Sequence, residues 1–147
     1  MATITEREQQ NREAAIRIAE RLWNKREYEL VDEEYDPLVE MHTFSDPDIV
    51  GTKAVKEFVQ RYHEAFSDFH VELFDVQAVD DRVFARYRMT GTHDGPLESP
   101  QGDVPPTHRK MDMWGLVEAR YEGGLCVEEW NATDQMTLMH QLGLAPE

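Results

Sequence analysis

Residues 82–93, RVFARYRMTGTH, form the stretch that decides the fold of this chain. One side of the stretch is apolar and ends in a histidine: Val83, Ala85, Tyr87, Met89, Gly91 and His93. The other side carries Arg82, Arg86, Arg88 and Thr90. Successive side chains of a strand point to opposite faces, so this period of two predicts a β-strand with one buried face.

Segments on both sides of this stretch repeat the pattern. Residues 69–79 precede it across an Asp80-Asp81 turn, and we assign Phe69, Val71, Leu73 and Asp75 to their inner face. Residues 108–121 form a further strand, and the turn at 122–124 leads into the last strand, 125–134. Long strands joined by short turns predict an antiparallel meander, whose apolar face needs a cover.

Helical segments supply that cover. Apolar residues recur at helical spacing in 5–26 and 52–66, and shorter helices are indicated at 27–35, before Pro37, and at 135–142. Thr5 with Glu8 has the spacing of a capping box, and Thr52 is a candidate cap. A first strand is indicated at 38–44.

The order of these elements predicts one α+β domain over residues 1–147. We expect a cone-shaped α+β barrel, in which a curved, mostly antiparallel sheet wraps around three N-terminal helices. Such a cone encloses an internal pocket, which is the natural ligand site of the fold.

Composition restricts the partners. The net charge of -15 argues against nucleic acid and against an anionic membrane surface. No apolar run is long enough to cross a bilayer, and the charged N-terminal segment does not resemble a signal peptide, so we expect a cytoplasmic protein. The acidic excess with four lysines is similar to that of halophilic proteins. The single cysteine, Cys126, is expected to be a buried hydrophobic residue.

Three short motifs carry a family resemblance. They are Gly91-Thr92-His93-Asp94-Gly95, Glu129-Trp130 with Asp134 four residues after the tryptophan, and Gln141-Leu142-Gly143. With the element order, they resemble the SnoaL-like polyketide cyclase branch of the nuclear-transport-factor-2-like superfamily. The resemblance implies a homodimer and a cofactor-independent enzyme, in which a pocket carboxylate removes a proton next to a carbonyl group and the enolate closes a ring by an aldol reaction.

Strand geometry selects the candidate bases. Cys126, Glu128, Trp130, Ala132 and Asp134 alternate along the last strand, so we expect Glu128, Trp130 and Asp134 to line the pocket. Asp112 lies across the hairpin, close to Asp134. By resemblance, Glu128 takes the position of the cyclases' acidic residue. A solvated carboxylate remains the alternative for Glu128, and a helix N-cap the alternative for Asp134.

Other side chains could bind the ligand. His93 and His42 are candidate hydrogen-bond donors, with His93 assigned to the catalytic set, while Tyr87, Trp114 and Trp130 are candidate pocket walls. Packing in the core is the alternative for His93 and Tyr87. The histidines show no His-x-His or His-x-x-x-His spacing, so no metal site is expected.

Two other functions fit the same residues. A non-catalytic domain that binds a small apolar molecule needs the pocket alone. An epoxide hydrolase or dehydratase of the superfamily is less favoured, because Arg109-Lys110-Met111-Asp112 lacks the Arg-x-Asp motif of epoxide-hydrolysing relatives. Carboxylates that all point to solvent would weigh against an enzyme.

Overall fold

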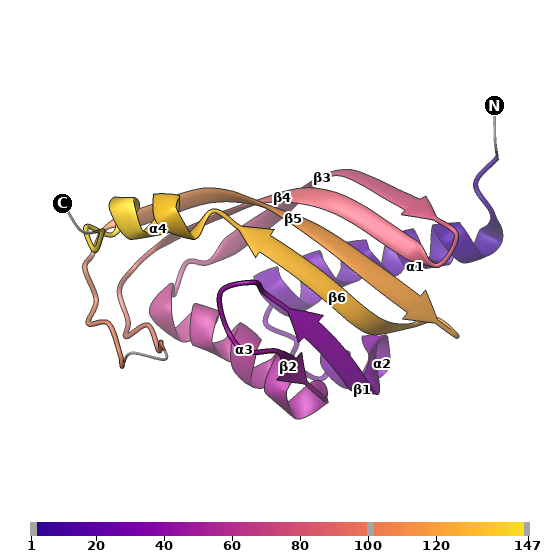
Figure 1. The fold of residues 1–147 in the computed structure, drawn as a ribbon, viewed down its shortest axis with the longest axis horizontal. Coiled ribbons are helices and arrows are strands. Elements are labelled where there is room, and N and C mark those ends of the chain that lie inside the picture. Colours follow the sequence, from indigo (N-terminus) through magenta and orange to yellow (C-terminus); the bar gives the residue numbers. More distant parts are fainter. Residues whose placement is uncertain (1–2, 100–101, 146–147) are drawn as a thin grey trace.

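The computed structural model describes residues 3–99 and 102–145 and shows a mixed α+β fold (Figure 1). Its six-stranded sheet has the order β2-β1-β6-β5-β4-β3. The strands are β1 (Tyr35–His42), β2 (Ile49–Val50), β3 (His70–Val79), β4 (Arg82–Thr92), β5 (Lys110–Glu122) and β6 (Leu125–Thr133). The predicted antiparallel meander is confirmed for β3 to β6, and β1 adds a parallel pairing to β6.

The stretch 82–93 has the burial that its alternation predicts. The side chains of Val83, Tyr87 and Met89 are buried, whereas the arginines Arg86 and Arg88 are exposed on the opposite face. Tyr87 pairs with Gly115 of β5, and a Cβ at Gly115 would lie 2.5 Å from the Tyr87 hydroxyl oxygen. The glycine therefore leaves room for the Tyr87 ring to lie against β5.

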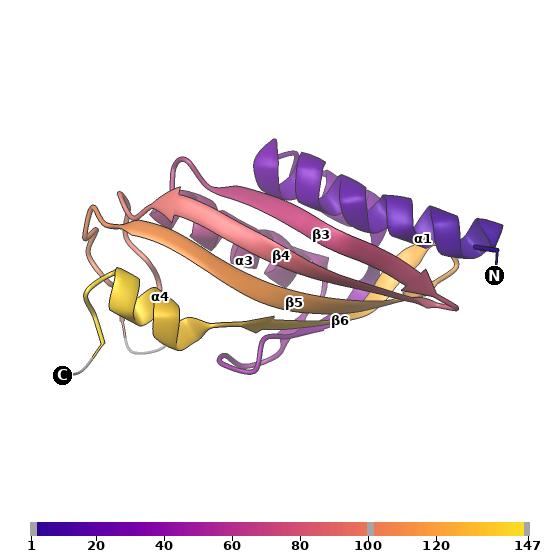
Figure 2. The ribbon, with the colours of Figure 1, turned by 90° about the horizontal axis from the view of Figure 1, so that it is seen from above.

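Helices cover the inner face of the sheet (Figures 1 and 2). They are α1 (Glu6–Arg17), the wider π-helical continuation η1 (Ile18–Asn24), α2 (Leu30–Glu34) and α3 (Thr52–Ala65), while the short α4 (Gln135–Gln141) follows β6. The predicted capping box is confirmed, because the Glu8 amide donates to the Thr5 hydroxyl at 3.1 Å and the Thr5 amide to Glu8 at 2.9 Å. None of the helices of the described residues is long and apolar enough to cross a membrane.

Of two local predictions at the helix ends, one is wrong and one is confirmed. The N-cap of α3 is Gly51, with φ +89°, and Thr52 is already the first helical residue without a side-chain cap. The predicted end of the second helix before Pro37 is confirmed, because α2 ends at Glu34, but the first strand begins at Tyr35 instead of residue 38 and so includes Pro37. Proline is tolerated there because the pairing of β1 with β6 is irregular between Tyr35 and Glu40.

The π-helical segment shapes the cover of the pocket. Its turns are wider than those of an α-helix, because the Lys25 amide donates to the carbonyl of Glu20, five residues earlier. At its end, the Asn24 side chain donates to the Val71 carbonyl and accepts from the Val71 amide, both at 2.8 Å. This pair of hydrogen bonds fixes the helix to β3 and holds Trp23 against Phe69, with ring centroids 5.3 Å apart.

A bulge changes the faces of β3. The register with β4 shifts between Phe74 and Gln77, and Asp75 there has a φ of 52°. The extra residue turns Asp75 outward, where its carboxylate accepts from Arg86 at 2.7 Å. Our assignment of Asp75 to the inner face is therefore wrong, because a strict period of two does not survive a bulge.

Candidate functional site

A cavity of about 100 Å³ lies between the inner face of the sheet and the helices. This volume holds several waters or a small ring-sized ligand. Aromatic side chains form one part of its wall: Trp23, Phe58, Tyr62, Phe69, Tyr87 and Tyr121. Aliphatic residues of β3, β4 and β5 form another, and Thr43, Ser45, Asp46, Asn131, Thr133 and Gln135 supply the polar atoms at its edge.

Glu129 places a carboxyl group in this apolar cavity. Its exposed fraction is only 9%. Burial raises the pKa of Glu129 to about 7, and hydrogen bonds from Asn131 and Tyr35 limit the rise. A carboxyl with such a pKa exchanges protons near neutral pH, which suits a general base.

A second bulge explains why Glu129, and not Glu128, faces the cavity. In the pairing with β5, Arg120 faces Glu128 but Tyr121 already faces Cys126, so Val127 is an extra residue. Cys126 is buried as predicted, and the alternation restarts one position later. The predicted pocket positions of Glu128 and Trp130 are therefore wrong, because both lie on the outer face of the sheet.

Buried phenols accompany the carboxyl group. The Tyr121 hydroxyl is buried and has no hydrogen-bond partner among the residues that the structure describes. Burial, then the neighbouring Cys126 and Glu129, raise the pKa of Tyr121 well above its ordinary value. Burial likewise raises the pKa of Tyr87. Both groups therefore stay protonated, and each hydroxyl keeps a proton that it can donate.

The other two candidate bases lie outside the cavity. Asp112 is exposed on the outer face of β5 and accepts two hydrogen bonds from Arg88, at 2.7 and 2.6 Å, which lower its pKa. Asp134 is the N-cap of α4: it accepts from the Thr137 amide at 3.0 Å and hydroxyl at 2.6 Å, which lower its pKa. Their predicted pocket positions are wrong, and for Asp134 the helix-cap alternative is correct.

The two candidate histidines also lie away from the cavity. His93 is fully buried, but it packs against Phe66 with ring centroids 5.5 Å apart, and its Nδ1 accepts from the Thr107 amide at 3.2 Å. His42 lies on the outer face, where its Nε2 is 2.8 Å from a Glu128 oxygen. The core alternative is therefore correct for His93, and the predicted pocket position of His42 is wrong.

Of the eight predicted site residues, Tyr87 lines the cavity. Trp114 is 45% exposed and packs on the outer face beside Phe74, which corrects its predicted position in the pocket wall. Sequence reasoning missed Glu129, Asn131 and Tyr121. A signal for Glu129 was present, since Glu129-Trp130 is part of the family motif, but the bulge that turns it inward has no mark in the sequence.

The sequence profile described as SnoaL-like polyketide cyclase matches residues 13–142. The chain belongs to the SnoaL-like polyketide cyclase family. No curated protein matches this family member.

Solved structures share the fold of this SnoaL-like chain. A protein from Jannaschia sp. CCS1, assigned as a SnoaL-like polyketide cyclase, has a TM-score of 0.88 and 22% identity, over 99% of this chain and 100% of that one. One from Bacillus cereus ATCC 10987, assigned as a polyketide cyclase, has a TM-score of 0.79 and 26% identity, over 97% and 87%. AclR of Streptomyces galilaeus, assigned as a hydroxylase, has a TM-score of 0.79 and 22% identity, over 95% and 85%. One fold thus carries different assigned activities.

Proposed function

We propose that this SnoaL-like protein is a cofactor-independent enzyme of the cyclase or isomerase type, which uses Glu129 as a general base on an apolar carbonyl compound. The observation that carries the proposal is the buried Glu129 carboxyl, with a pKa of about 7, in a cavity walled mainly by aromatic and aliphatic side chains. The apolar wall selects an apolar substrate and also raises the pKa of the base.

The residues around the cavity define one reaction step. The Glu129 carboxylate removes a proton from the carbon next to the carbonyl, and the electron pair of the broken C–H bond moves to the carbonyl oxygen. The Tyr121 hydroxyl, which has no hydrogen-bond partner within residues 3–99 and 102–145, donates to the enolate oxygen that forms. In a cyclase, the enolate carbon then bonds to a second carbonyl carbon, whose oxygen takes the proton from Glu129. In an isomerase, Glu129 returns the proton to a different carbon.

The non-catalytic alternative uses the same cavity without the proton transfer. The hydrolase alternative has less support, because Asp112, the carboxylate that it required, is bound to Arg88 on the outer face. If the protein binds a ketone and leaves it chemically unchanged, it is a binding domain. If it exchanges the protons of that ketone, it is an enzyme.

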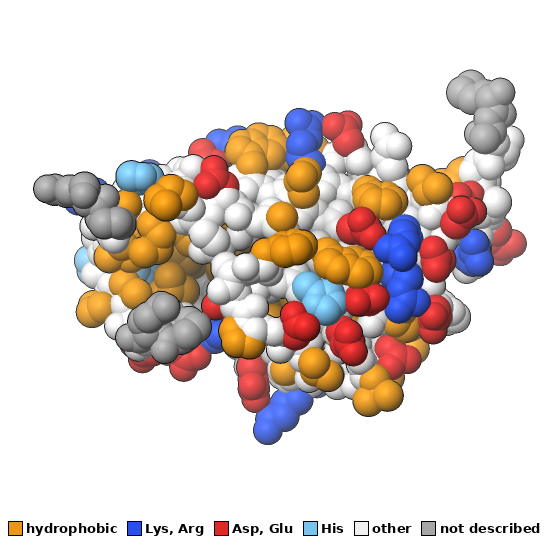
Figure 3. Space-filling model, in the orientation of Figure 1, with side chains coloured by type: hydrophobic (Ala, Val, Ile, Leu, Met, Phe, Trp, Pro, Cys, Tyr) orange, Lys and Arg blue, Asp and Glu red, His pale blue; other side chains and the backbone are white. Residues whose placement is uncertain are grey.

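The outer face of the sheet supports a homodimer as part of the proposal. Large apolar side chains are exposed there, among them Leu116 at 60% and Trp114 at 45%. Figure 3 shows hydrophobic side chains gathered over this side of the sheet, next to arginines and carboxylates. Exposed apolar surface of this kind commonly marks an interface, and a second copy would cover it back to back.

Proton exchange tests the proposed chemistry without knowledge of the natural substrate. The probe is 2-indanone, an apolar bicyclic ketone with acidic protons next to its carbonyl group, dissolved in D₂O with the protein and followed by ¹H NMR. We expect enzyme-dependent loss of these proton signals, slower by roughly 10²- to 10⁴-fold in Glu129→Gln. The matched control Glu72→Gln changes an exposed carboxylate of β3 and retains the rate.

Two outcomes oppose the proposal in different ways. If Glu129→Gln exchanges the ketone protons as fast as the wild type does, Glu129 is not the base. Ketone-induced shifts in the spectrum of the protein, without proton exchange, would support the binding-domain alternative.

A further inference from the structure

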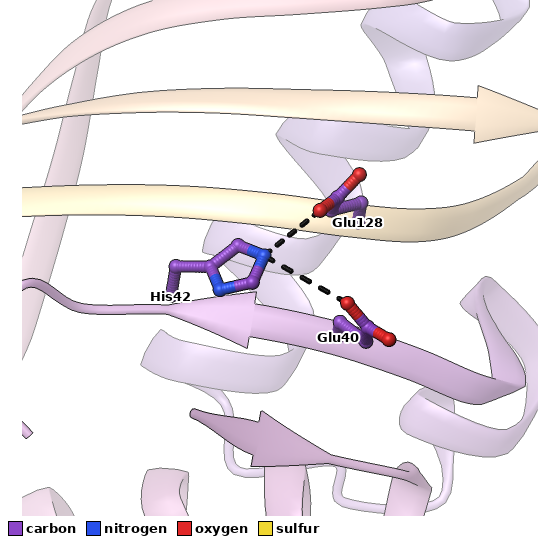
Figure 4. Close-up of side chains that lie close together, drawn as sticks. All are labelled: Glu40, His42 and Glu128. Carbon is purple, nitrogen blue, oxygen red and sulfur yellow. Dashed lines mark hydrogen bonds and ion pairs between the residues drawn. The ribbon is translucent and has the colours of Figure 1, made fainter. Parts of the chain in front are cut away.

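A second group of functional side chains lies on the outer face of the sheet, behind the cavity. Glu40 and His42 alternate along β1, and Glu128 of the neighbouring β6 points toward them (Figure 4). The His42 Nε2 is 2.8 Å from a Glu128 oxygen and 4.0 Å from a Glu40 oxygen. One ligand atom from each residue lies within 4.8 Å of the others.

Asp48 determines which nitrogen of His42 faces the two glutamates. Its carboxylate lies 2.9 Å from Nδ1, so it accepts a hydrogen bond from a protonated Nδ1. In a neutral imidazole this leaves the Nε2 lone pair directed at Glu128 and Glu40. A proton on Nε2, donated to Glu128, or a metal ion at the same place removes the repulsion between this lone pair and the carboxylates. A carboxylate–histidine pair of this kind also orients the histidine in zinc sites.

The spacing of the three ligands fits a small divalent ion. Zinc bonds to imidazole nitrogen and carboxylate oxygen at about 2.0–2.2 Å, which places tetrahedral ligands roughly 3.3 Å apart. The two distances from Nε2 bracket this value, so small side-chain rotations would complete the set. Arg120 contacts the other oxygen of Glu128, at 3.3 Å, and leaves Oε2 for the ion. Glu40 is half exposed, so water can reach a fourth position.

We propose that Glu40, His42 and Glu128 form a zinc-binding site that fastens β1 to β6. The proposal rests on this geometry and not on the proposed enzyme activity. It also differs from our expectation of no metal site, which considered only pairs of histidines. That expectation did not consider the Glu-x-His spacing of Glu40 and His42. On a strand, this spacing puts both side chains on one face.

An ion at this site would also affect the cavity on the other side of the sheet. The residue after each of two ligands lines the cavity: Thr43 follows His42, just beyond the end of β1, and Glu129 follows Glu128 within β6. The ladder between β1 and β6 is short and regular only from Glu40 to His42. An ion that joins the two strands here would therefore hold Thr43 and the Glu129 carboxyl at a fixed separation.

Calorimetry tests the site directly. EDTA-treated protein is titrated with ZnCl₂ at pH 7.5, and we expect saturable binding of one ion per chain. His42→Gln and Glu40→Gln should each weaken binding more than 100-fold, and Asp48→Asn, which removes the orienting carboxylate, by roughly 10- to 100-fold. The matched control His70→Gln removes an exposed histidine of β3 and retains the wild-type affinity.

Cobalt provides an independent measurement. Co²⁺ in a tetrahedral protein site absorbs visible light far more strongly than hydrated Co²⁺, so wild-type protein should turn blue on addition of CoCl₂ and Glu40→Gln should not. Glu40 is half exposed, so its variant is expected to fold, as far-UV circular dichroism will verify. Absence of saturable zinc binding by the wild type, or equal affinity in the folded His42→Gln and Glu40→Gln variants, would overturn the proposal.

Discussion

The substitution Glu129→Gln should make the protein more stable at high pH. The carboxyl ionises near its ordinary value of 4.5 in the unfolded chain, whereas burial holds the pKa at about 7 in the folded protein. Between these two values the folded state binds more protons than the unfolded state, so the free energy of unfolding falls as pH rises. The loss is absent below pH 4.5 and complete above pH 7. Glutamine has nearly the same shape and cannot ionise, so the variant avoids it.

The size of the effect follows from the pKa difference. A rise from 4.5 to about 7 corresponds to about 3 kcal/mol of lost stability once the group is fully ionised. At pH 5 only about 1 kcal/mol of this loss has developed, because this pH lies only slightly above the pKa of the carboxyl in the unfolded chain. The stability advantage of Glu129→Gln over the wild type should therefore grow by about 2 kcal/mol between pH 5 and pH 8.

Urea unfolding at these two pH values measures the difference. Wild type, Glu129→Gln and the exposed control Glu72→Gln are compared by tryptophan fluorescence, with equal m-values as the condition for the comparison. The control should differ from the wild type by the same amount at both pH values. The reasoning is refuted if the advantage of Glu129→Gln is also the same at pH 5 and pH 8, since the buried carboxyl would then not be destabilised by ionisation.

Three further substitutions test other parts of the structure. Tyr121→Phe removes a buried hydroxyl that has no partner in the described part of the chain, so thermal unfolding should show unchanged or higher stability, by up to about 1 kcal/mol, while ketone proton exchange slows. A marked loss of stability would contradict this. Gly115→Ala places a Cβ against the Tyr87 ring and should cost about 1–3 kcal/mol in urea unfolding, and a variant as stable as the wild type would show that the ring can move away. Leu116→Glu should shift the elution volume from dimer to monomer, and a wild-type monomer would remove the dimer from the proposal.

Most of the fold could be predicted from the sequence because burial follows simple periods. The alternation of residues 82–93 predicted which side of β4 is buried, and the Thr5–Glu8 spacing predicted the cap of α1. The parallel pairing of β1 with β6 could not be predicted, since residues far apart in the sequence carry no local mark of their partner.

The site could be predicted only in part. The pairing of β4 with β5 has no bulge, so the inward position of Tyr87 follows from the alternation of its strand alone. Beyond Val127 a single extra residue reverses the faces of β6, so the same rule selected Glu128 and Trp130 in place of Glu129 and Asn131. The pocket position of Asp134 was predicted wrongly for a different reason. A short polar side chain at the start of a helix is more strongly stabilised as an N-cap than in an apolar cavity.

A crystal structure of the protein with bound 2-indanone would show whether the Glu129 carboxyl is placed to act on a ketone in the cavity. We expect the ketone to occupy the cavity beneath Tyr87, with a Glu129 oxygen next to a carbon adjacent to the carbonyl group and the Tyr121 hydroxyl within hydrogen-bond distance of the ketone oxygen. A ketone bound on the outer face, or one in the cavity with its reactive carbons away from Glu129, would contradict it.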